Sequence, residues 1–91
     1  FEEFVTSAGP MPAEYGIGAL QVLLRMRNGY GASIVRHQYS YGNEDNLFEL
    51  AVIRWYEEGW AIVYTTPITD NVLPNLMPEE VVTVLHAIHK L

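Results

Sequence analysis

Hydrophobic and polar positions alternate with a period of two over residues 20–27. The apolar set consists of Leu20, Val22, Leu24 and Met26. Such alternation is typical of a half-buried β-strand. The run ends at Asn28-Gly29, a pair that readily supplies two residues with positive φ for a tight turn. A short β-branched run follows at 32–37, so we predict an antiparallel hairpin.

Two further strands are predicted downstream, over residues 47–56 and 60–66. In the first of these, Phe48, Leu50 and Val52 fall on one face. The second is rich in β-branched and aromatic residues, which favour strands. It stops at Pro67, because proline has no N–H for a ladder. We expect Trp60, at the start of this strand, to lie in the core.

The C-terminal segment is the only one with a helical pattern. Pro78 suits the first helical position, and the acidic pair at 79–80 favours the positive end of the helix dipole. One stripe recurs at helical spacing and consists of Val81, Val84, Leu85 and Ile88. A helix of about 14 residues is marginal alone in water. We therefore predict an α+β fold, a four-stranded antiparallel β-meander with one C-terminal α-helix packed on one face.

The organisation predicted is an N-terminal tail or linker over residues 1–18 and a single α+β domain over 19–91. Residues 9–18 contain two prolines and three glycines, which disfavour both helix and strand. Residues 1–10 match nothing that follows, and we interpret them as upstream or added sequence outside the fold.

The composition then excludes several kinds of functional site. The 91 residues are 49% hydrophobic and carry a formal net charge of −6, with a sequence pI near 4.8. There is no cysteine, which excludes disulfides, thiolate metal sites and cysteine nucleophiles. No apolar run reaches the roughly 18 residues of a membrane span. We expect a cytoplasmic domain, with no membrane association.

Candidate chemistry is sparse. His86 and His89 are three residues apart on the predicted helix, but no further ligand is fixed in register with them. Ser33 and His37 lie on one predicted strand without the turn geometry that activates a serine nucleophile. The sequence therefore predicts no catalytic residue, no metal site and no cofactor, and a small enzyme is the third-ranked hypothesis.

Basic residues are placed differently from acidic ones, because four of the five lie on or beside predicted strands. Arg25, Arg36 and Arg54, interleaved with tyrosines, form an alternative nucleic-acid face on which bases could stack. Arginine stems that cover the solvent side of a sheet explain the same pattern. The net negative charge also disfavours direct nucleic-acid binding. The same negative charge would suit a mimic of nucleic acid that occupies a basic groove on another protein.

The aromatic content instead indicates protein contacts. Two tyrosines flank a serine in the polar loop 39–46, a composition favoured in recognition surfaces. Together with the predicted hairpin tip at 27–31, this loop gives our candidate partner-binding residues. They are Arg27, Tyr30, Tyr39, Tyr41, Glu44 and Asp45.

From residue 20 onward the chain resembles a group of small bacteriophage-encoded proteins. The segments that carry the resemblance are 28–31 (NGYG), 41–44 (YGNE), 47–52 (LFELAV), 66–70 (TPITD) and 78–81 (PEEV). The resemblance attaches no activity to these positions. It implies a non-enzymatic protein that binds, and inhibits, a bacterial host protein in the host cytoplasm, for example a CRISPR or other defence nuclease. A homodimer through a free sheet edge is a further hypothesis.

Overall fold

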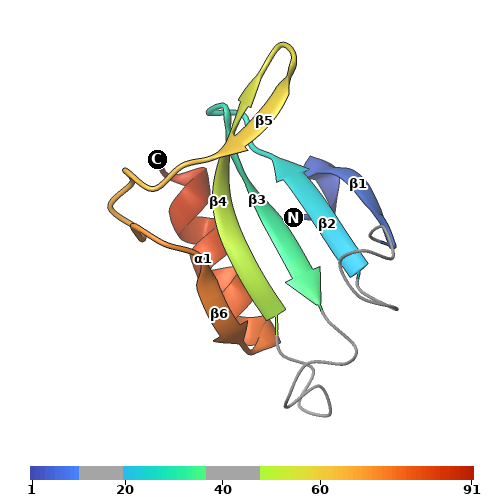
Figure 1. Cartoon of the computed structure of the whole chain (residues 1–91), viewed down its shortest axis with the longest axis vertical. Coiled ribbons are helices and arrows are strands. Elements are labelled where there is room, and N and C mark those ends of the chain that lie inside the picture. Colours follow the sequence, from blue (N-terminus) through green and yellow to red (C-terminus); the bar gives the residue numbers. More distant parts are fainter. Residues whose placement is uncertain (11–19, 37–47) are drawn as a thin grey trace.

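The described part of the chain forms one antiparallel sheet with a single α-helix against one of its faces, seen in the computed structural model of Figure 1. The structure describes residues 1–10, 20–36 and 48–91. The elements in chain order are the 3-10 helix η1 (Glu2–Phe4), β1 (Val5–Pro10), β2 (Leu20–Arg25), β3 (Tyr30–Arg36), β4 (Phe48–Tyr56), β5 (Gly59–Ile62), β6 (Leu73–Leu76) and α1 (Pro78–His89). The α+β class and the C-terminal helix agree with the sequence-based prediction.

The sheet has six strands where four were predicted. Its order is β1-β2-β3-β4-β5, and β6 also pairs with β4. β4 is nine residues long, so its beginning pairs with β6 and its end pairs with β5. The sequence did not predict β6, because Pro74 and Asn75 interrupt any alternating pattern. Asn75 has a φ of 57°.

Residues 1–10, which we expected outside the fold, contribute the other additional strand. β1 pairs antiparallel with β2, from Val5 opposite Leu24 to Pro10 opposite Leu20. Its sequence of small and polar residues gives no periodic signal, because most of its side chains are exposed. Phe1 and Phe4, just before it, pack against the hydrophobic core.

The β2–β3 hairpin is confirmed, but its turn differs from the predicted two-residue turn. Only Gly29 has a positive φ there, at 87°. The Met26 N–H donates to the Tyr30 carbonyl oxygen at 2.7 Å, and the Gly29 N–H donates to that of Met26 at 3.2 Å. This pattern is that of a three-residue loop with a glycine at its left-handed position.

The core lies between the sheet and α1. It is formed by Leu24, Met26, Ala32, Ile34, Leu50, Val52, Val81, Leu85 and Ile88. The predicted helix stripe is confirmed, since three of its four residues are buried and Val84 packs beside them. Trp60 was predicted wrongly, because its side chain is 37% exposed on the short strand β5. No helix of the described ranges is long and apolar enough to span a bilayer.

Asn28 fixes the β2–β3 turn to the end of α1. Its Nδ2 donates to the carbonyl oxygens of Ile88 at 2.8 Å, Leu91 at 3.2 Å and His89 at 3.4 Å. Its Oδ1 accepts the Tyr30 N–H at 3.0 Å. Because the last carbonyls of a helix have no partner within it, this side chain acts as a tertiary cap.

Candidate functional site: an aromatic surface at one end of the sheet

The strand register assigns each arginine to a face of the sheet. Residues directly opposite one another in antiparallel strands share a face. Tyr30 lies opposite Arg54 and packs against the core that α1 covers, so Arg54 is on the helix side. Arg25 lies opposite Gly31, one residue further along, and is therefore on the face away from α1.

The alternative nucleic-acid face is thus divided. Arg36, two residues after the core residue Ile34, shares the helix side with Arg54, while Arg25 does not. Two of these arginines lie over aromatic rings. The Arg54 Cζ is 4.8 Å from the centroid of the Tyr30 ring, and the Arg25 Cζ is 5.7 Å from that of Trp55. Each of these rings has one face against a guanidinium of the chain itself.

The predicted partner-binding residues are only partly located. Arg27 is exposed at the tip of the β2–β3 hairpin, and Tyr30 is half-buried beside it. Tyr39, Tyr41, Glu44 and Asp45 lie outside the residues that the structure describes. The β2–β3 turn adjoins the base of the next hairpin, since the Trp55 N–H donates to the Gly29 carbonyl oxygen at 2.8 Å.

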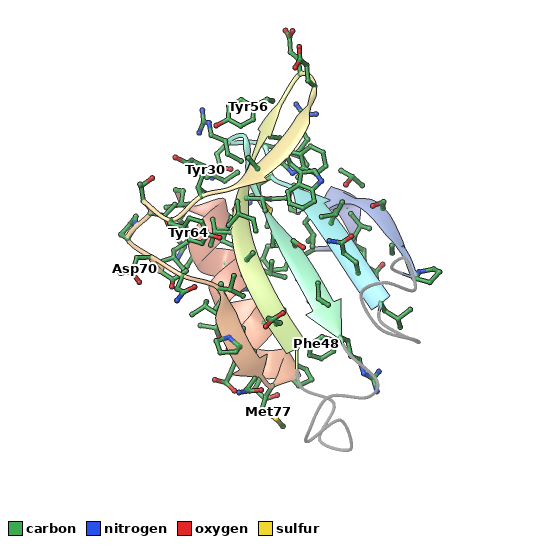
Figure 2. The ribbon with its side chains drawn as sticks, in the orientation of Figure 1. Tyr30, Phe48, Tyr56, Tyr64, Asp70 and Met77 are labelled. Carbon is green, nitrogen blue, oxygen red and sulfur yellow. The ribbon has the colours of Figure 1, made fainter. Side chains whose placement is uncertain are left out.

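That next hairpin, β4–β5, carries an apolar surface that the sequence reading missed. Its exposed residues are Tyr56 (54%), Trp60 (37%), Ile62 (39%) and Tyr64 (49%). By the register, Trp60 and Ile62 lie on the face of Trp55, Tyr56 lies on the face of Arg54, and Tyr64 follows the end of β5. We call these four residues together the aromatic hairpin surface. They make up half of the eight large hydrophobic side chains that are exposed in the described ranges. Figure 2 shows Tyr30, Tyr56 and Tyr64 along one side of the end from which the hairpin projects.

An open hollow of about 280 Å³ lies at the tip of this hairpin. Its lining consists of Tyr56, Glu58, Gly59 and Trp60. Gly59 has a φ of 146°, a conformation that favours glycine at this point of the turn. The hollow combines one carboxylate with two aromatic side chains, an arrangement that suits a cation.

The backbone of β5 is paired on one side only. The Val63 N–H donates to the Val52 carbonyl oxygen at 2.9 Å, so Val63 directs its polar groups toward β4. Successive residues of a strand direct these groups to alternate sides. Trp60 and Ile62 therefore present their N–H and C=O groups at the outer edge, beyond which the described part of the chain has no strand.

A second hollow, of about 290 Å³, lies between η1 and the end of α1 and is lined by Phe1, Glu3, Phe4, His86 and His89. Its histidines contact phenylalanine rings, with centroids 4.8 Å apart for Phe1 and His86 and 5.3 Å for Phe4 and His89. Among the described residues no group of three or more His, Cys, Asp or Glu could hold a metal ion.

Ser33, the nucleophile candidate among the described residues, has a structural environment. It is 6% exposed, and its Oγ accepts a hydrogen bond from the Gln21 Nε2 at 3.0 Å. The hydrogen-bond partner of the Ser33 hydroxyl is therefore an amide side chain on the neighbouring strand β2, which is not titratable.

The comparisons with known proteins leave the site to be interpreted from its own geometry. No protein-family model, curated protein or solved structure matches the chain. The aromatic hairpin surface is accordingly the feature on which a functional interpretation can be built.

Proposed function

We propose that this chain is a non-enzymatic protein-binding domain and that the aromatic hairpin surface contacts its partner. The observation that carries the proposal is the gathering of four exposed apolar residues within positions 56–64. Tryptophan and tyrosine are enriched among the residues that dominate binding energy. They also provide large contact areas at a low cost in side-chain entropy.

The partner we propose is a bacterial host protein, as the resemblance to small phage proteins implies, and the effect on it is inhibition. A defence nuclease such as a CRISPR effector is the specific form of this proposal. The acidity of the hairpin supports a basic contact surface on the partner, because Glu57 and Glu58 are exposed at its tip.

The arginine contacts favour a protein over a nucleic acid as the partner. Stacking platforms for bases need free aromatic faces together with cations that reach the phosphates. Here Arg54 and Arg25 lie over the rings of Tyr30 and Trp55, and they do so on opposite faces of the sheet. The net charge of −6 further weakens attraction to phosphate.

Capture from a bacterial lysate, with and without nuclease treatment, tests the proposal. We expect one stoichiometric protein that survives nuclease and is lost when Tyr56→Ala and Trp60→Ala are combined. The matched control combines Met77→Ala and Val82→Ala, which remove equally exposed apolar side chains from the start of α1. Equal loss in both double variants, or recovery that disappears with nuclease, would refute the assignment.

A further inference from the structure

We infer that β5 binds an extended, basic segment of the protein partner as an added strand, with a lysine or arginine side chain of that segment in the hollow at Tyr56, Glu58 and Trp60. This inference rests on the proposed function and specifies the mode and chemistry of the contact. The occupant is a segment of another protein, not a second copy of this chain.

The exposed backbone of β5 supports strand addition. Trp60 and Ile62 present N–H and C=O groups at an edge, and their side chains share one face of the sheet with Trp55 and the buried Ile53. An incoming strand would pair with these groups and place alternate side chains beside Trp60 and Ile62.

The three edge strands of the described sheet differ in how well they resist such pairing. β1 contains Pro10 and a register shift near Val5, and β6 contains Pro74 and the left-handed Asn75. Prolines and irregularities are the devices by which edges avoid pairing with other strands. β5 contains no proline, its positive-φ residue Gly59 is confined to its first position, and all four of its residues are uncharged.

The hollow specifies a basic side chain. A cation there would approach the Glu58 carboxylate and the rings of Tyr56 and Trp60. The two arginines nearest the hairpin lie over other rings, Arg54 over Tyr30 and Arg25 over Trp55, and residues 55–89 contain no lysine or arginine. For the same reason a second copy that paired through its own β5 would bring no basic side chain to the hollow.

The test starts from a displayed library of random dodecapeptides selected on the full chain. We expect the enriched peptides to share one lysine or arginine within an alternating run of β-branched or aromatic residues. The best peptide is then synthesised, together with a form in which that basic residue is replaced by methionine. Affinities are measured by fluorescence anisotropy.

Two matched pairs of variants separate the backbone contact from the charge contact. Ile62→Pro removes the outward N–H as well as the side chain, whereas Ile62→Ala removes only the side chain. We expect Ile62→Pro to bind the peptide about tenfold more weakly than Ile62→Ala. Glu58→Gln should weaken binding about threefold to fivefold, and Glu57→Gln, outside the hollow, should not.

Equal affinities of Ile62→Pro and Ile62→Ala would overturn strand addition. Equal affinities of the lysine and methionine peptides, or no effect of Glu58→Gln, would overturn the basic side chain. Sedimentation of the chain alone as a dimer that Ile62→Pro dissociates would assign the edge to a second copy. A library without enriched peptides would also reject the inference, while loss of the captured protein in the Tyr56/Trp60 double variant would still support the proposed function.

Discussion

Asn28 connects a β-turn to the end of a helix 60 residues later in the chain. Asn28→Ala should lower the free energy of unfolding by about 1–2 kcal/mol, because partly buried carbonyl groups at the end of α1 lose their donor. Urea denaturation measures the change. Arg27→Ala is the control, since it removes an exposed side chain from the same turn. Equal stability of the two variants would contradict the capping role.

Gly31 is required by a neighbouring strand. A Cβ at this position would collide with the Leu24 carbonyl oxygen, which also accepts the Trp55 Nε1–H at 2.8 Å. Gly31→Ala should therefore destabilise the fold by about 3 kcal/mol or more. Gly9→Ala, where a Cβ would meet nothing within 4 Å, should be nearly neutral. Thermal unfolding of the two variants measures the difference. Similar melting temperatures for both variants would refute the steric argument.

Individual residues could be predicted only where local chemistry decides their conformation. The turn at Asn28-Gly29 was predictable because glycine alone adopts a positive φ at little cost. The capping of α1 by Asn28 was not, since it depends on where the helix ends in space. Trp60 was misplaced because its type suggests burial, whereas its short edge strand leaves it exposed.

At the level of elements, a substitution in η1 tests how much residues 1–10 contribute to the stability of the domain. Phe4 packs against the core and contacts the His89 ring, with centroids 5.3 Å apart. Phe4→Ala should cost about 1–2 kcal/mol of stability, because half-buried apolar area is lost. Val5→Ala, at a 40% exposed position, is the comparison in chemical denaturation. A neutral Phe4→Ala would mean that this segment contributes nothing to the fold.

Most of the elements that the sequence predicted pack against the core. β2, β3, β4 and α1 each direct one face toward it, and this burial imposes the period of two or 3.6 that a sequence displays. β5 is the exception, because the β-branched and aromatic residues of 60–66 predicted a strand although three of the four residues of β5 are exposed. β1 and β6 lack that period because backbone pairing, rather than side-chain burial, holds them in the sheet. Pairing of this kind leaves little trace in the choice of residues.

For the molecule as a whole, the sequence suggested protein binding but did not locate the surface that we propose for it. Its aromatic richness suggested protein contacts, and the candidate residue Tyr30 lies opposite Arg54 of β4. The aromatic hairpin surface itself was missed, because Tyr56 and Trp60 were assigned to strands without knowing that β5 is an edge. An acidic turn between two aromatic residues was the available signal.

The distribution of charge over the molecule predicts weak interaction with nucleic acid. We expect no binding of a fluorescently labelled oligothymidylate at about 0.15 M salt, because a net charge of −6 opposes phosphate and the arginines are split between two faces. Anisotropy titration checks this. Micromolar binding that Arg25→Glu abolishes would restore the nucleic-acid hypothesis.

Residue-resolved amide hydrogen exchange, measured by NMR on the chain alone and with its captured partner, tests the central claim most directly. The outward N–H groups of Trp60 and Ile62 should exchange rapidly in the free chain and become protected in the complex. The amides of residues 5–9 in β1 should exchange equally in both states. Protection confined to β1, to α1 or to residues 39–46, with Trp60 and Ile62 unchanged, would contradict the account.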